Sequence, residues 1–194
     1  MTRIFEPDNA EIVRLALVRT LRNGAAAAAD DAEGADDGAD YRISVGLDSA
    51  LSQYVDNYKN PFPLVDVHLS SVRAAAGSAT VNRRNRSAVF DILCMAEGNS
   101  GGGKNPWRSA NTRAWKVARV VRRILEAEEN TYLGLRGVVS AHSVEEMQAG
   151  QVDEESSSVW VCAVKVSVRV DFVEGVDVVT GEALEGAMTE INSD

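Results

Sequence analysis

One stretch near the C-terminal end of the sequence, residues 159–172, alternates between an apolar and a more mixed set of side chains. A period of two puts every second residue on the same face of an extended strand, whereas a helix would scatter these residues around its circumference. The sequence therefore predicts a long β-strand, and the fold must supply a second layer to cover its apolar face. That face consists of Trp160, Cys162, Val164, Val166, Val168, Val170 and Phe172.

Other segments have weaker strand character, namely residues 41–47, 64–69, 86–95, 131–139 and 176–179. Residues 86–95 are apolar on both faces, which indicates an interior strand. Residues 64–69 follow a proline-containing turn, Asn60–Pro63, and carry valine and leucine on one face. In 131–139 the two glycines, Gly134 and Gly137, predict a turn that leads into a short strand.

Two segments have the 3.6-residue period of an amphipathic helix. The first starts after Pro7, where Asp8 or Asn9 can cap a helix, runs for about 15 residues and is expected to end at Gly24. The second follows the glycine-rich residues 98–103 and keeps its apolar stripe through about 20 residues. A further short helix is expected to begin at Ser143, whose side chain would cap it.

The order of these elements predicts an α+β fold, with a mostly antiparallel sheet and two main helices packed on one face. A chain of 194 residues can bury one core but not two full domains. We therefore expect a single α+β domain over residues 1–174, interrupted by a flexible acidic loop at 24–40, and an acidic C-terminal arm at 175–194.

Charge is distributed unevenly along the chain. The net charge is −9, from 20 Lys and Arg against 29 Asp and Glu, which argues against a general DNA-binding protein. Residues 73–123 nevertheless hold 11 basic and two acidic residues, while residues 24–40 hold six acids and residues 171–194 seven, with no base in either. A molecule with two poles of opposite sign can associate head to tail with its own copies. The alternative is a solvated basic helix face with two disordered acidic segments.

Catalytic and metal-binding patterns are weak. His68 has Asp66 on the same strand face, an arrangement typical of a surface pair, and neither His142 nor the separated cysteines, Cys94 and Cys162, have the spacing of a metal site or a nucleophile. The segment Gly98–Lys104 departs from a phosphate-binding loop because its lysine is followed by asparagine instead of serine or threonine. We expect no enzyme activity, no cofactor and no metal.

No apolar stretch approaches the roughly 20 residues that cross a bilayer, and the first residues lack the basic and apolar pattern of a secretory signal. We therefore expect a protein that is made and used without crossing a membrane.

The arrangement of these segments resembles the tail terminator (tail completion) proteins of tailed bacteriophages, over roughly residues 7–173. The resemblance rests on the N-terminal amphipathic helix and on the segments Pro61–Val67, Arg86–Ile92, Val120–Leu125, Tyr132–Val139 and Trp160–Phe172. It implies a non-enzymatic virion protein, assembled in the host cytoplasm, whose copies form a hexameric ring. Such a ring caps the tail tube once the tube is complete and presents a surface for the head to join.

The implied partners are other copies of this chain, the tail tube protein, a neck, connector or head-completion protein, and a sheath protein if the tail contracts. Genomic DNA would pass through the channel without specific binding. Two interpretations stay open beside this one: another neck, connector or adaptor ring of the same particle, and a small ligand-binding domain that uses Gly98–Lys104.

Two groups of residues are the candidates for contacts in such a ring. The basic face of the long helix is expected to contact a neighbouring subunit, with the C-terminal acidic arm of that copy as its natural counterpart, and its members are Arg113, Lys116, Arg119, Arg122 and Arg123. The acidic loop or arm is expected to face the lumen or an adjacent ring, where it would repel DNA phosphates, and its members in the loop are Asp30, Asp31, Asp36 and Asp37.

Overall fold

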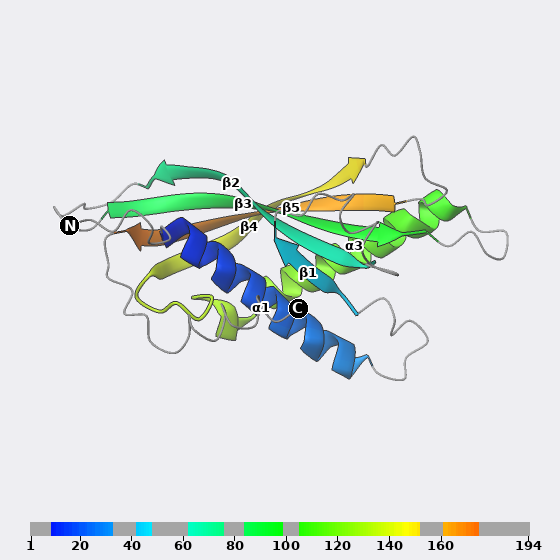
Figure 1. The fold of residues 1–194 in the computed structure, drawn as a ribbon, viewed down its shortest axis with the longest axis horizontal. Helices are drawn as coiled ribbons and strands as arrows, with labels where there is room; N and C mark the ends of the chain where they lie inside the picture. The colour runs from blue at the N-terminus through cyan, green and yellow to red at the C-terminus, as the bar shows by residue number, and fades with distance from the viewer. Residues whose placement is uncertain are drawn as a thin grey trace.

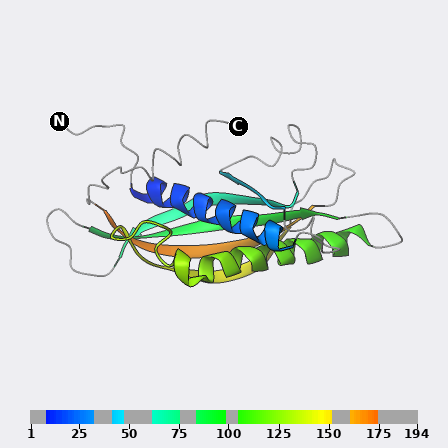
Figure 2. The same cartoon turned by 90° about the horizontal axis from the view of Figure 1, so that it is seen from below.

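The computed structural model describes residues 9–32, 42–47, 62–75, 84–98, 105–151 and 161–174. In chain order its elements are α1 (Asn9–Asp31), β1 (Ser44–Leu47), β2 (Leu64–Ala74), β3 (Arg84–Glu97), α3 (Pro106–Glu126), the short 3₁₀ helix η3 (Glu128–Asn130), β4 (Val139–Gln151) and β5 (Val161–Glu174) (Figure 1). The strands form one sheet, and Figure 2 shows α1 and α3 lying across the same face of it. The predicted α+β class is therefore confirmed.

The sheet has five strands in the order β1-β2-β3-β5-β4. β1 runs parallel to β2, and every other neighbouring pair is antiparallel. β3 and β5, each 14 residues long, form the centre of the sheet and pair along their whole lengths. The interior position predicted for residues 86–95 is confirmed, because β3 has β2 on one side and β5 on the other.

The core lies between the sheet and the two helices. The strand predicted from alternation is β5, and Val164, Val166, Val168 and Val170 on its helix-facing side are fully buried. Phe90 and Ile92 of β3 stand opposite Val168 and Val166 and are equally buried. Each such side chain contributes about 1.5–3 kcal/mol through burial, so this double row is the main reason that the two helices stay on this face.

The helix α1 is longer than predicted, because it continues through Gly24 and the following alanines to Asp31. Gly24 lies where α1 crosses α3, and a Cβ atom there would come within 2.5 Å of Cγ2 of Ile124. The glycine thus permits a close helix crossing and does not end the helix. Residues 25–29 are alanines, the strongest helix formers, and Ala25 is buried. The flexible loop predicted at 24–40 is wrong for residues 24–32, and residues 33–40 lie outside the described ranges.

The helix predicted to begin at Ser143 is also wrong, because residues 139–151 form the edge strand β4. The pairing of β4 with β5 shifts register twice, between Val139 and Ala141 and between Val144 and Glu146. At each shift one extra residue enters β4, so the residues that face the core change from odd to even positions or back. The sequence of β4 therefore lacks a continuous period of two. The predicted turn is confirmed at Gly134 and Gly137, which have positive φ angles of 72° and 91°.

Several predicted boundaries move or fall outside the described part of the chain. β2 extends five residues beyond the predicted end at Leu69, to Ala74, and β1 begins at Ser44. The isolated bridge at Arg136 is the only strand pairing of the described residues 131–138. The predicted strand at 176–179, the arm 175–194 and the cap at Asp8 lie outside the described residues.

Candidate subunit interface

The basic helix α3 is fixed to the sheet at its first turn. Oδ1 of Asn105 accepts a hydrogen bond from the backbone N–H of Arg108 at 3.4 Å, and Pro106 stands at the first helical position, where its missing N–H costs nothing. Gly98 packs directly beneath this turn, since a Cβ there would lie 2.0 Å from the carbonyl oxygen of Pro106. The end of β3 and the start of α3 therefore touch backbone to backbone.

The C-terminal end of α3 is fixed by side chains that contact carbonyl groups left unpaired by the helix. Nδ2 of Asn130 donates to the carbonyl oxygen of Ile124 at 2.7 Å. The His142 ring, which projects from β4, lies between the carbonyl oxygens of Leu125 and Thr131, with Nε2 at 2.7 Å from the first and Nδ1 at 3.0 Å from the second. His142 thus binds α3 to the edge of the sheet, a structural role that its sequence context does not indicate.

The apolar stripe of α3 faces the sheet, so its basic side chains lie on the outer surface. Ala114, Val117, Val121 and Leu125 are buried, and this periodicity confirms the orientation that the sequence predicted. The basic residues on the other side do not all have the same environment.

Arg119 and Arg123 are exposed and form no ion pair with any residue that the structure describes. Arg122 is also exposed and pairs with Glu126 one turn later, Nε to Oε1 at 2.8 Å. Exposed pairs of this kind contribute about 0–1 kcal/mol, so the pair with Glu126 leaves Arg122 available to another partner. The three arginines form a contiguous basic surface at the C-terminal half of α3.

The other two predicted members of this face contribute differently. Nη1 of Arg113 donates to the carbonyl oxygen of Glu97 at 2.7 Å, and thereby connects α3 to the end of β3. Lys116 is half-buried. Arg108, by contrast, is exposed in the first turn of α3, on the same outer side as Arg119, and the sequence prediction did not include it. Arg108 is 11 residues before Arg119, which is about three helical turns. This spacing could have placed Arg108 on the same face from the sequence alone.

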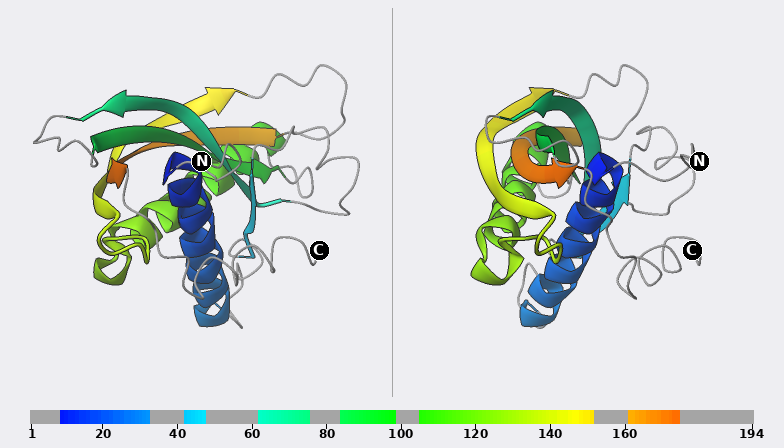
Figure 3. Two further views of the ribbon diagram at one scale, coloured as in Figure 1. Left: turned by 60° about the vertical axis from the view of Figure 1, so that its left-hand side comes forward. Right: turned by 90° about the vertical axis from the view of Figure 1, so that its left-hand side faces the viewer.

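The acidic candidates that the structure describes are at the end of α1. Asp30 and Asp31 are the last two residues of this helix, and both are exposed. Figure 3 shows this end of α1 pointing away from the sheet. Carboxylates near a helix C-terminus are unfavourable by about 0.3–1 kcal/mol each, because the free carbonyls there are already negative. Helix stability therefore does not explain these acids. Asp36 and Asp37 lie outside the described residues.

A row of polar side chains crosses the face of the sheet that the helices leave uncovered. His68, Asp91 and Ser167 are directly opposite one another on β2, β3 and β5. Ser167 Oγ donates to Oδ1 of Asp91 at 2.7 Å, while His68 Nε2 lies 3.2 Å from the buried Asp66. The hydroxyl of Ser167 therefore points to a carboxylate and not to the imidazole, which differs from the nucleophile and base pair of a hydrolase.

Within the described ranges, no group of three potential metal-binding side chains comes together, and no helix has the length and apolarity to span a bilayer. No protein-family model matches this chain, and a search of curated proteins finds no match to it.

Proposed function

We propose that this protein is a tail terminator of a tailed bacteriophage: a structural protein whose copies close into a hexameric ring that caps the tail tube and provides the surface for head joining. The observation that carries the proposal is exposed charge of opposite sign on two helices of one fold. Arg119 and Arg123 lie unpaired on the outer face of α3, within the described residues, and the end of α1 presents Asp30 and Asp31.

Opposite charge on two helices of one subunit favours a heterologous contact, in which the basic group of one subunit meets the acidic group of its neighbour. Each added copy leaves one group of each kind free, so the same contact repeats, and it gives a ring when the rotation from one subunit to the next closes after six copies. In this proposal the basic surface of α3 meets an acidic surface of the next copy. The order helix, three strands, helix, two strands, with both helices on one face, agrees with the resemblance drawn from the sequence.

A terminator ring must let DNA pass without retaining it. The chain has a net charge of −9, and the acids that follow α1 in the sequence, among them Asp36 and Asp37, are proposed to provide a lining that repels phosphate. At physiological ionic strength this repulsion acts over about 8 Å, which is the scale of contact within a narrow channel. The proposed partners at the two faces of the ring are the tail tube protein and a neck or head-completion protein. In a contractile tail, the sheath protein is a further proposed partner.

The proposal is tested by the mass of the full-length protein in solution, measured by native mass spectrometry or light scattering with negative-stain images of the same sample. The protein is measured alone and together with tail tubes of the same virus. A closed ring of six, either free or formed on the tube ends, is the expected result. A monomer that ignores tubes would contradict the proposal.

The contact surface is tested separately by charge reversal. The double variant Arg119→Glu and Arg123→Glu should abolish ring formation while leaving the circular dichroism spectrum unchanged. Arg42→Glu is the control, because Arg42 is exposed just before β1 and lies outside α3. Rings of unchanged stability in the double variant would remove α3 from the interface.

A further inference from the structure

The outer edge of β2 is open over its second half. β1 pairs with β2 only from Leu64 to Val67, and no other strand of the described chain pairs with residues 68–74 on that side. Leu69 and Val72 stand opposite Phe90 and Ala88 and therefore point to the helix-bearing face, yet they are 37% and 44% exposed. An open edge with exposed apolar side chains is a template for an added strand.

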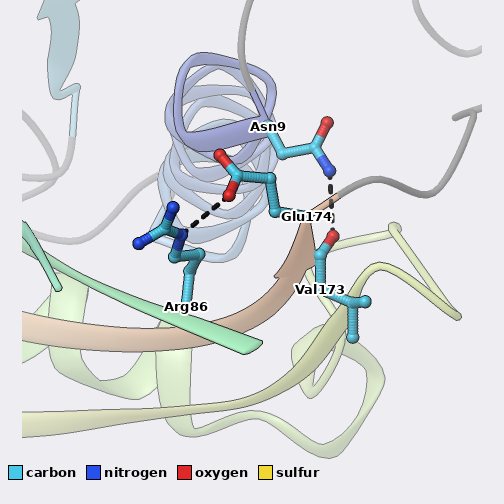
Figure 4. A network of polar contacts seen from close by, with 4 residues as sticks. All are labelled: Asn9, Arg86, Val173 and Glu174. Carbon is cyan, nitrogen blue, oxygen red and sulfur yellow. Dashed lines mark hydrogen bonds and ion pairs between the residues drawn. The ribbon is translucent and has the colours of Figure 1, made fainter. Parts of the chain in front are cut away.

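The same corner of the sheet is basic. Arg73 near the end of β2 and Arg84 at the start of β3 are both exposed. One acidic side chain already binds there: Nε of Arg86 lies 2.7 Å from Oε2 of Glu174, the last residue of β5 (Figure 4). Asn9 at the start of α1 holds this end of β5 in place, because its Nδ2 donates to the carbonyl oxygen of Val173 at 2.9 Å.

The chain continues from Glu174 into a sequence with the complementary chemistry. Residues 175–194 contain five acids and no base, and they begin with the β-branched run Val176-Asp177-Val178-Val179-Thr180. Valine and threonine are favoured in strands, the valines suit an apolar edge, and Asp177 suits a basic corner. This run therefore matches both properties of the β2 edge.

The run cannot occupy the edge of its own subunit. β2 and β5 end at the same end of the sheet, because each is antiparallel to β3. A strand added outside β2 would lie three strand spacings, about 14 Å, from β5. Val176 is only two residues beyond Glu174, and two residues span about 7 Å at most. A second copy has no such restriction.

We infer that residues 176–180 of one subunit add as a strand to the β2 edge, residues 68–74, of the next subunit. The valines cover Leu69 and Val72, and the acids of the arm lie against Arg73 and Arg84. This inference rests on the proposed function in requiring that copies of the chain associate. It is compatible with the α3 contact, because α3 packs on β3, β5 and β4, toward the opposite edge of the sheet from β2.

Disulfide trapping between full-length single variants tests the inference. One preparation carries Val72→Cys, and the other, labelled with ¹⁵N, carries Val178→Cys. The two are mixed in a glutathione redox buffer at several protein concentrations. The disulfide-linked species are then identified by intact mass. Ser143→Cys, on the exposed surface of the opposite edge strand β4, replaces Val72→Cys in the control. Cys94 and Cys162 are buried, and burial raises the pKa of both thiols, so they react slowly in every sample.

The mixed disulfide between Val72→Cys and Val178→Cys should exceed the control by about tenfold or more, because the two thiols share an effective concentration near 1 mM in the contact. Adding Arg73→Glu should lower that yield about fivefold. Equal yields with Ser143→Cys, no mixed disulfide at any concentration, or a disulfide that forms only within one chain when both cysteines are in the same molecule would overturn the inference.

The outcomes separate this inference from the proposed function. Rings without the mixed disulfide would leave the terminator proposal standing and remove the strand contact. The mixed disulfide in a protein that ignores tail tubes would keep the strand contact and remove the terminator proposal.

Discussion

Substituting Gly98 with alanine should strongly destabilise the fold. Gly98 is buried at the end of β3, where an added Cβ would lie 2.0 Å from the carbonyl oxygen of Pro106, 2.8 Å from its carbonyl carbon and 3.1 Å from Cβ of Ala110. The first two of these are backbone atoms, so no rotamer change can relieve the clash. The start of α3 must move away from the sheet, against the buried Ala110 and the hydrogen bond from Arg113 to the carbonyl of Glu97.

Added volume in a well-packed core typically costs about 1–3 kcal/mol. Because this contact is with backbone and far inside van der Waals distance, we expect a loss of about 3 kcal/mol for Gly98→Ala. For a chain of this size each kcal/mol lowers Tm by about 2–4 °C, so Tm should fall by about 6–12 °C.

Gly24→Ala is the matched control. Its Cβ would also meet a close neighbour, at 2.5 Å, but that neighbour is the side chain of Ile124, which can repack. Alanine in the helix interior also contributes about 1 kcal/mol relative to glycine, so the net loss should be about 1 kcal/mol or less. Both variants are measured by urea unfolding, followed by circular dichroism. A loss below about 1 kcal/mol for Gly98→Ala, or equal losses for the two variants, would refute the backbone clash as the reason for this glycine.

Three other changes test separate parts of the structure. His142→Ala should lower the free energy of unfolding by about 2 kcal/mol, because the carbonyl oxygens of Leu125 in α3 and of Thr131 after it lose their side-chain partner; an unchanged urea midpoint would show that His142 does not stabilise α3. Asp30→Asn together with Asp31→Asn should raise stability by about 0.6–2 kcal/mol through the helix dipole yet weaken ring formation, and urea unfolding and native mass spectrometry check the two effects; a lower free energy of unfolding would refute the dipole argument. Phe90→Ala should cost about 4 kcal/mol in the same urea assay, and a loss under about 2 kcal/mol would mean that the core lies elsewhere.

Elements with an uninterrupted period could be predicted from the sequence. β5 and α3 each keep one period, so their type and buried face were predicted correctly, and β3 was correctly predicted as an interior strand because both of its faces are apolar. β4 was missed because two register shifts break its alternation. The predicted end of α1 at Gly24 was wrong. Glycine often ends a helix, but here it lies inside the helix and permits the close crossing with α3. That crossing depends on Ile124, a residue 100 positions away.

The candidate interface divides in the same way. The helical period placed Arg119 and Arg123 on the outer face of α3, and the structure agrees. The contact of Arg113 could not be predicted, because its acceptor is the backbone of Glu97 on another element. The open edge of β2 depends on strand order, which the sequence does not determine, since β1 covers only the first four residues of β2.

The alanine run of α1 sets the position of the acids at its end. Past the crossing at Gly24 the helix continues through five alanines, and Ala28 still packs against the core. Each residue of helix advances the end by about 1.5 Å and turns it by about 100°. One alanine more or fewer would therefore swing Asp30 and Asp31 to a different side of the helix, whereas a change of seven residues would restore their direction about 10 Å further along. The length of the alanine run therefore determines both the distance of these two carboxylates from the crossing and the direction in which they point.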